Sequence, residues 1–272
     1  MPHLAEESHP TALIVGASRG LGRGIATAIA ATGTPVVAVA RTPSPLAELV
    51  RTGAIRTELA DARDPSTAGR LLNRHEPHVV ILVAGASPVI APLQHQTWAT
   101  FSVNWHSDVK VAFHWVRAAL LRPLPPGSRM IVISSGAALN GSPLSGGYAG
   151  AKSTQRFITA YAQDESDRAE LGISFTAVLP RITPLTDLGR PAVEAYAARN
   201  GQTEEQYLAP FGAPLTPEKA GDALVELLQT NTDELAPEYL LSAAGLQALS
   251  RPASPPAAAP PTEHPIPLRA RA

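Results

Sequence analysis

The feature that most constrains the fold is an alternation of short apolar runs with longer helical patterns along most of the chain. Such alternation predicts a parallel sheet, because right-handed crossover helices return the chain to the same end of the sheet. We therefore expect an α/β fold, a doubly wound parallel sheet flanked by helices on both faces, in a single domain. The predicted strands span residues 11–15, 35–40, 54–58, 78–83, 129–134 and 173–179, and the longest predicted helices span residues 94–121 and 147–171.

The composition is that of one domain with a sizeable core. The 272 residues are 44% hydrophobic, and α/β domains of this length often form one unit. The formal net charge of −1 argues against nucleic acid as the main partner. The chain contains no cysteine, which excludes disulfides, thiol catalysis and thiolate metal sites. No histidine–carboxylate cluster has the spacing of metal ligands, so we expect no metal.

The two ends of the chain differ in composition from the part between them. Residues 1–10 are polar and are predicted to form a flexible lead, without the charged-then-apolar layout of a signal peptide. Residues 251–272 include seven prolines among small residues and are predicted to be a disordered tail. No apolar run approaches the ~20 residues that a membrane span needs, so we expect no membrane contact and a cytoplasmic protein. The folded domain is expected over residues 11–250.

A glycine-rich turn follows the first predicted strand. Gly16, Gly20 and Gly22 stand between that strand and a helical pattern over residues 21–32. Glycines let a ligand approach the backbone closely, and the helix N-terminus offers free N–H groups to a pyrophosphate. The spacing is G-x-x-x-G-x-G rather than the G-x-G-x-x-G of the dinucleotide fingerprint, so the match is one of mechanism. A turn chosen only for tight packing is the alternative, and we favour nucleotide binding.

Two short motifs supply candidate acid–base groups. Tyr148 and Lys152 are four residues apart in a predicted helix, so their side chains share one face. An unperturbed tyrosine titrates near ~10, and a neighbouring ammonium favours its phenolate, although many surface helices contain such a pair by chance. Ser134 and Ser135 end the fifth predicted strand, where open α/β sheets bind ligands. These serines can equally be turn residues that satisfy the backbone.

Together these motifs resemble the short-chain dehydrogenase/reductase family, in its single-domain branch with G-x-x-x-G-x-G and Y-x-x-x-K motifs. The resemblance extends over about residues 11–241 and implies a Rossmann-like fold. The family has a catalytic tetrad of Asn, Ser, Tyr and Lys. In this chain the residues that match it, in the same order, are Asn104, Ser135, Tyr148 and Lys152.

The resemblance implies an oxidoreductase that interconverts a carbonyl and an alcohol by hydride transfer with a nicotinamide cofactor. In that chemistry Ser135 hydrogen-bonds the substrate oxygen, and Tyr148 exchanges a proton with it as acid or base. Lys152 favours the phenolate and binds the nicotinamide ribose, and Asn104 holds a water that links Lys152 to solvent. The expected substrate is a small or medium, largely apolar ketone or alcohol.

The charges around the second predicted strand favour NADP(H) over NAD(H). An NAD enzyme commonly has an acid at the end of that strand, but Ala40 stands there and Arg41 follows. Arg41 and Arg19 both suit a 2′-phosphate, although two ordinary surface arginines would give the same pattern. Asp61 matches the family's acid at the adenine edge, or else it caps the helix that begins near Asp64.

Three segments depart from the family pattern. The run Asn-Asn-Ala-Gly after the fourth strand is Leu82-Val83-Ala84-Gly85, which keeps the close backbone approach but removes side-chain hydrogen bonds. The Pro-Gly after the sixth strand is Pro180-Arg181, and Thr183 or Thr186 is expected to hold the carboxamide. The segment 238–245 replaces Val-Asp-Gly-Gly at the last strand. The residues expected to contact the cofactor are Gly16, Ser18, Arg19, Gly20, Leu21, Gly22, Arg41, Asp61, Ala84, Gly85, Tyr148, Lys152, Pro180 and Thr183.

Substrate choice in the family comes from the segment after the sixth strand, here a predicted lid over residues 181–214. Within it, residues 203–206 have the form of a capping box and predict a further short helix. Four residues at helical spacing form either a lid face or ordinary core contacts: Ala192, Val193, Tyr196 and Ala197.

The resemblance also bears on partners and on a second hypothesis. The two longest predicted helices pair between subunits in the family, which implies a homodimer or homotetramer. The second hypothesis for function is a non-catalytic NADP(H)-binding sensor or scaffold protein on the same fold. The complete set of Asn104, Ser135, Tyr148 and Lys152 favours the enzyme, because a sensor has no need of a proton relay.

Overall fold

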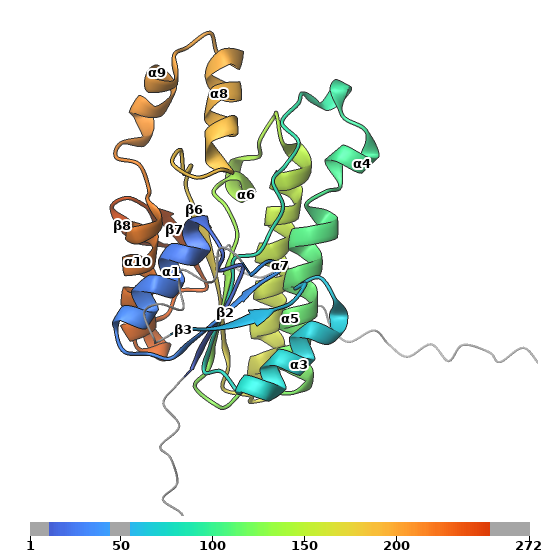
Figure 1. Ribbon diagram of the computed structural model, residues 1–272, viewed down its shortest axis with the longest axis vertical. Coiled ribbons are helices and arrows are strands. Elements are labelled where there is room, and N and C mark those ends of the chain that lie inside the picture. The colour runs from blue at the N-terminus through green and yellow to red at the C-terminus, as the bar shows by residue number, and fades with distance from the viewer. Residues whose placement is uncertain (1–10, 44–54, 251–272) are drawn as a thin grey trace, which may run out of the picture.

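A twisted eight-stranded sheet forms the centre of the molecule, with helices on both faces (Figure 1). The computed structural model describes residues 11–43 and 55–250, so the predicted lead, residues 1–10, and the predicted tail, residues 251–272, lie outside the described residues. The strand order is β3-β2-β1-β4-β5-β6-β7-β8, and every neighbouring pair is parallel except β7 and β8. The order reverses after β1, which confirms the predicted Rossmann-like, doubly wound sheet. The strands are β1 (Ala12–Val15), β2 (Val36–Ala40), β3 (Ile55–Leu59), β4 (Val79–Leu82), β5 (Arg129–Ile133), β6 (Ser174–Pro180), β7 (Glu238–Ser242) and β8 (Gly245–Leu249).

The central strands are apolar because both of their faces are covered. All four residues of β1 and all five of β2 are buried, as expected for a sheet between two helical layers. One core lies between the sheet and helices α1 (Gly20–Ala31) and α10 (Pro217–Gln229). The other lies between the sheet and helices α3 (Pro65–His75), α5 (Lys110–Leu121) and α7 (Gly146–Arg168). Because β1 to β7 are parallel, the loops that follow their carboxyl ends all lie at one edge of the sheet.

The predicted helix over residues 94–121 is wrong, because the chain breaks it into four pieces. A 3₁₀ turn η1 (Leu93–His95) ends before an extended residue, and Thr97 then begins the short helix α4 (Trp98–Phe101) with a capping box. A π-helical turn η2 (Trp105–Val109) joins a bend at Ser102 to α5. The apolar pattern of this segment alone predicts one continuous helix. The capping box at Thr97 and the π turn divide it. By contrast, α7 closely matches the predicted helix over residues 147–171.

The segment 238–245 contains the expected last strand and the turn into another. β7 pairs in parallel with β6, and β8 folds back on β7 as an antiparallel edge strand. We did not predict β8, because its alternating pattern is short and follows the preceding strand after two residues.

The segment after β6 projects beyond the sheet together with α4 (Figure 1). It contains helix α8 (Gly189–Arg199), helix α9 (Glu204–Leu208) and the 3₁₀ turn η3 (Ala209–Phe211). The Thr203 hydroxyl accepts a hydrogen bond from the Gln206 N–H and the Gln206 side chain accepts one from the Thr203 N–H, which confirms the predicted capping box. A further short 3₁₀ turn, η4 (Thr232–Glu234), precedes β7, and α6 (Ala137–Asn140) precedes α7.

Candidate functional site

A cavity of about 1030 Å³ opens at the carboxyl ends of the parallel strands. Ligands bind at this edge in open α/β sheets, where the strand order reverses. The cavity wall includes the glycine turn after β1, the end of β2, the turn after β4 and the first turns of α7. Many of the positions that sequence reasoning assigned or weighed line it, among them Gly16, Ser18, Arg19, Gly20, Leu21, Gly22, Arg41, Asp61, Ala84, Gly85, Ser135, Tyr148, Lys152, Pro180, Arg181, Thr183 and Thr186.

The glycine turn lies directly against the turn that follows β4. Gly16 has φ of +96°, and a Cβ atom placed on it would come within 2.5 Å of the Ala84 backbone nitrogen. α1 begins at Gly20 with no acidic residue in its first turn, so its N-terminal N–H groups and dipole face the cavity without a competing carboxylate. This arrangement can accept a phosphate group beside the backbone.

Three of the arginines that line the cavity come from the glycine turn and from the segments that follow β2 and β3. Arg41 follows directly after β2, and Arg19 lies 3.4 Å from Asp187 with both side chains largely exposed. The Arg63 guanidinium forms a forked hydrogen bond with Asp61 at 2.9 and 2.6 Å, which lowers the pKa of that carboxyl to about 2. Asp61 does not cap α3, because Asp64 is the N-cap and accepts from Ser66 N–H.

α7 presents the candidate acid–base pair to the same cavity. The Lys152 ammonium donates to the Ile133 carbonyl at 3.2 Å and lies 5.6 Å from the centre of the Tyr148 ring. Within the described residues, no hydrogen bond joins the Tyr148 hydroxyl to another side chain or to the backbone, so it is available to a ligand. Ser134 is buried and donates to the Lys152 carbonyl at 2.8 Å, whereas Ser135 faces the cavity and accepts from Ala137 N–H.

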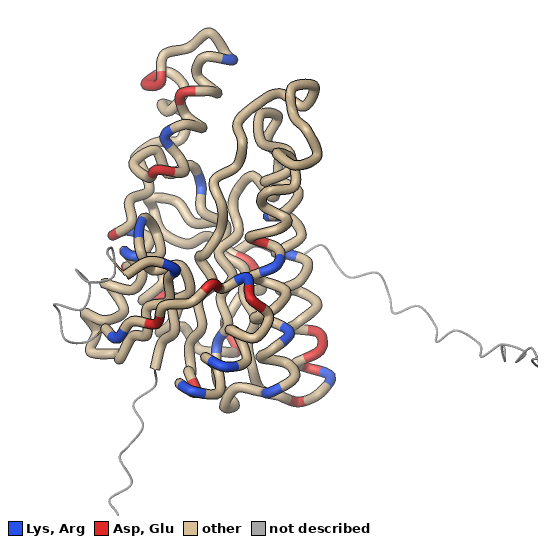
Figure 2. Tube along the Cα trace, turned by 45° about the vertical axis from the view of Figure 1, so that its right-hand side comes forward, with Lys and Arg blue, Asp and Glu red and all other residues tan. Residues whose placement is uncertain are grey.

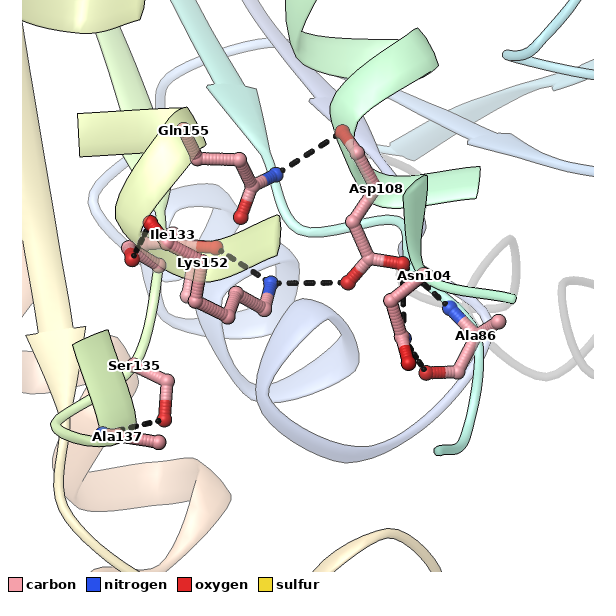
Figure 3. A network of polar contacts seen from close by, with 9 residues as sticks. Ala86, Asn104, Asp108, Ile133, Ser135, Ala137, Lys152 and Gln155 are labelled. Atoms are coloured by element: carbon pink, nitrogen blue, oxygen red, sulfur yellow. Dashed lines mark hydrogen bonds and ion pairs between the residues drawn. The ribbon is translucent and has the colours of Figure 1, made fainter. Parts of the chain in front are cut away.

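Asn104 is the one predicted catalytic residue that does not line the cavity. It is 1% exposed, and its amide nitrogen donates to the Ala86 carbonyl at 2.7 Å and to Asp108 at 3.2 Å (Figure 3). Asp108 is also within 3.2 Å of the Lys152 ammonium. Sequence reasoning missed Asp108, although its position four residues after Asn104 was a usable signal for a shared face.

The lid segment supplies an apolar and aromatic wall. Tyr196, Tyr207 and Phe211 line the cavity. The rings of Tyr196 and Tyr207 are stacked with centroids 6.0 Å apart, and the Phe211 ring is tilted against Tyr207 at 5.5 Å. Both interpretations of the residues at helical spacing are right in part, because Ala192 and Tyr196 line the cavity while Val193 and Ala197 are buried in the core.

The two threonines after β6 are held together. The Thr183 and Thr186 hydroxyls lie 3.0 Å apart, and the Thr186 hydroxyl also donates to the Thr183 carbonyl. The Gly189 N–H donates to the Thr186 hydroxyl, so Thr186 is the more fully engaged of the two.

Residues 11–43 and 55–250 contain no group of three or more histidine or carboxylate side chains placed to hold a metal ion. No helix in the same two segments is long and apolar enough to cross a bilayer.

Comparison with known proteins supports the fold and the family. Among solved structures of the same fold, ElxO with NADP bound is 18% identical with a TM-score of 0.72, over 86% of this chain and 96% of ElxO. A dehydrogenase/reductase from Sinorhizobium meliloti 1021 is 25% identical with a TM-score of 0.66, over 80% of this chain and 87% of its own. A short chain dehydrogenase from Mycobacterium avium is 20% identical with a TM-score of 0.72, over 94% and 90%. No curated protein matches this chain. The sequence matches the short chain dehydrogenase family over residues 10–197, and the chain therefore belongs to that family.

Proposed function

We propose that this protein is an NADP(H)-dependent oxidoreductase that interconverts a carbonyl and an alcohol. The observation that carries the proposal is that one cavity wall joins the glycine turn and Arg41 to Ser135, Tyr148 and Lys152. A phosphate-binding turn alone would suit many nucleotide-binding proteins, and a tyrosine–lysine pair alone is common. Their presence in the wall of one large cavity is what a dinucleotide enzyme needs, because one cofactor must contact both the phosphate-binding turn and the acid–base residues.

The residues present fit an NADP(H) cofactor. At Gly16, which lies close to Ala84, no side chain covers the backbone where a pyrophosphate would be held. Arg41 supplies a guanidinium for a 2′-phosphate. Asp61, with its pKa at about 2, is ionised at neutral pH and can accept a hydrogen bond from an adenine amino group. The cofactor would supply the hydride. ElxO, which has the same fold, was solved with NADP and, as a variant, with NADPH bound.

Proton transfer is assigned to the Tyr148 hydroxyl. It faces the cavity without another partner among the described residues, and the Lys152 ammonium lies 5.6 Å from the centre of its ring. Ser135 is proposed to hydrogen-bond the substrate oxygen, since its hydroxyl faces the same cavity. Asn104 does not line the cavity and is proposed to act indirectly, through its hydrogen bonds to Ala86 and Asp108.

The substrate is proposed to be a small or medium, largely apolar ketone or alcohol. Its site would lie between the acid–base residues and the aromatic lid wall of Tyr196, Tyr207 and Phe211, with the lid extending over residues 181–214. Aromatic and aliphatic walls with a few polar groups are typical of small-molecule sites.

A non-catalytic NADP(H) sensor is the second candidate. The buried position of Asn104, whose amide nitrogen donates to protein atoms, is the observation that favours it. Tyr148→Phe separates the two hypotheses. If the protein is an enzyme, the variant loses turnover and keeps cofactor binding. If it is a sensor, the variant behaves as the wild type does, because the Tyr148 hydroxyl has no catalytic role.

The first test is a titration of the protein with NADPH and with NADH, followed by nicotinamide fluorescence or calorimetry. We expect tighter binding of NADPH, and we expect Arg41→Ala to weaken it by about tenfold or more, as for a lost charge-assisted hydrogen bond. Arg56→Ala is the matched control, because Arg56 is an exposed arginine on β3 outside the cavity. Preference for NADH would contradict the cofactor assignment, and binding of neither would contradict the oxidoreductase.

The assembly is proposed to be a homodimer or homotetramer paired through α5 and α7. These helices lie side by side on one face of the sheet (Figure 1), and Phe113, Phe157 and Tyr161 on them are 50%, 57% and 61% exposed. Exposed aromatic side chains in one region are typical of protein interfaces. Light scattering coupled to gel filtration would measure the mass, and Phe157→Glu should yield a monomer. A wild-type monomer at micromolar concentration would contradict the proposal.

A further inference from the structure

Two long stretches of the chain contain no charged side chain, and each ends at a charged residue. Residues 77–107 lack Asp, Glu, Lys and Arg and are followed by Asp108, and residues 130–151 lack them and are followed by Lys152. Figure 2 shows the projecting arm that contains α4, which belongs to the first stretch, in tan throughout. The fold brings the two charges that end these stretches together, with the Lys152 nitrogen 3.2 Å from an Asp108 carboxylate oxygen.

The Asp108 carboxylate is buried and has several hydrogen-bond partners. It is 1% exposed, and the oxygen that does not contact Lys152 accepts from the Ala86 N–H at 3.0 Å and from the Asn104 amide at 3.2 Å. Its backbone carbonyl accepts from the buried Gln155 side chain of α7 at 3.1 Å (Figure 3). A buried carboxylate is costly unless it is paired and hydrogen-bonded, and this one is both.

The surrounding backbone fits closely around this carboxylate. A Cβ atom placed on Gly85 would come within 2.7 Å of the Asp108 carboxylate, so the turn after β4 leaves room for it only with glycine there. Asp108 lies in the π turn η2, where the Asn104 carbonyl accepts from both Asp108 and Val109 N–H groups. π turns of this kind are frequent at functional sites, because the extra residue redirects side chains.

We propose that Asp108 is a positioning residue of the cofactor and acid–base site, acting through Lys152. This inference rests on the proposed oxidoreductase function. A lysine side chain is flexible, and its ammonium has three N–H donors. Here one donor is directed to Ile133 and a second to Asp108, which fixes the nitrogen between β5 and η2 and leaves the third donor for a ligand.

The Asp108 carboxylate also links the Lys152 ammonium to the turn after β4, which lines the cavity. The side chains of Leu82 and Val83 are apolar and buried or half-buried, so neither can form a hydrogen bond there. Asp108 reaches the Ala86 N–H from η2 instead, and so couples Lys152 to the turn through one side chain. A change at Asp108 should therefore disturb both the position of the Lys152 ammonium and the turn after β4.

The test is a double-mutant cycle of wild type, Asp108→Asn, Lys152→Met and the double variant, with two readouts. The first is the dissociation constant for NADPH, and the second is the thermal midpoint of the cofactor-free protein. We expect Asp108→Asn to weaken NADPH binding about tenfold when Lys152 is present, as second-shell changes commonly do, and less than about twofold in the Lys152→Met background. Lys152→Met leaves Asp108 unpaired and should lower the midpoint sharply, and Asp108→Asn should recover part of that loss.

Glu238→Gln controls for loss of stability alone. It removes the carboxylate of the Arg156–Glu238 ion pair, which also involves α7 but lies outside the cavity. It should lower the midpoint and leave the NADPH dissociation constant unchanged. Equal effects of Asp108→Asn in both Lys152 backgrounds would overturn the positioning role, and so would an unchanged dissociation constant. Neither outcome would count against the proposed cofactor, provided that the wild-type protein binds NADPH. A wild-type protein that binds neither NADPH nor NADH would overturn both.

Discussion

The Tyr196 hydroxyl accepts a hydrogen bond from the Leu144 N–H at 3.0 Å, which joins the lid helix α8 to the loop before α7. The same hydroxyl is hydrogen-bonded to Ser142, which in turn lies 2.6 Å from the Ser145 hydroxyl. The Tyr196 ring stacks on Tyr207 of α9. One side chain thus holds both lid helices against the wall that carries Tyr148.

Tyr196→Phe should loosen the lid without changing the cofactor end of the cavity. Losing the hydroxyl leaves the Leu144 N–H and Ser142 without this partner, at a cost of about 1–3 kcal/mol of local stability. We expect hydrogen exchange in α8 to accelerate roughly tenfold, while the NADPH dissociation constant is unchanged. Tyr161→Phe, on the proposed subunit surface of α7 and outside the cavity, is the control. Unchanged exchange in α8 would show that the lid is held by packing alone.

Gly16→Ala should destabilise the cofactor-free protein more than Gly33→Ala. Both positions have positive φ, +96° and +88°, so both variants carry a strain of about 1–2 kcal/mol. Only at Gly16 does the new Cβ meet backbone, within 2.5 Å of Ala84, and this overpacking adds about 1–3 kcal/mol. Chemical denaturation measures both variants. Equal losses would mean that the turn moves to accommodate the methyl group.

Arg63→Gln should change how Asp61 titrates. Arg63 holds the pKa of Asp61 at about 2, below the ordinary 3.8, so the pair stabilises the fold above pH ~4 and the contribution is lost as the pH falls toward ~2. The side chains are 44% and 39% exposed, so solvent screening keeps this contribution below about 1 kcal/mol. NMR titration of the Asp61 carboxyl should show its pKa returning toward 3.8 in the variant. The stability difference from wild type should be largest near neutral pH and vanish near pH ~2.

Arg129→Met should destabilise the end of α10. The Arg129 guanidinium donates to the carbonyls of Leu227, Leu228 and Thr230 at 2.9, 3.1 and 2.6 Å, where a helix otherwise leaves its last carbonyls unpaired. We expect a loss of about 1–3 kcal/mol in the free energy of unfolding. Arg129→Lys should restore only part of it, because one ammonium cannot reproduce the planar fork. Arg117→Met, an exposed change on α5, should have little effect, and an equal effect would refute the capping role.

The structural features that were predicted correctly from the sequence depend on residues that are close together in the chain. The strands are marked by apolar runs, the turn at Gly16 by glycine spacing and the start of α9 by the capping box from Thr203 to Gln206. Each depends on chemistry within a few positions, so one sequence is enough to detect it. The assignment of site residues followed from the order of these motifs, and their individual roles remain predictions.

Long-range placement was decided only by the tertiary structure. Packing and capping broke the helix predicted over residues 94–121, and the π turn directed Asp108 toward Lys152 although 44 positions separate them in the chain. The sequence by itself determined the sheet type, the glycine turn and the tyrosine–lysine pair, since local periodicity and turn chemistry specify them. Which buried charges meet depended on the folded core, because desolvation makes an ion pair such as Asp108–Lys152 favourable only where other elements supply its remaining hydrogen bonds.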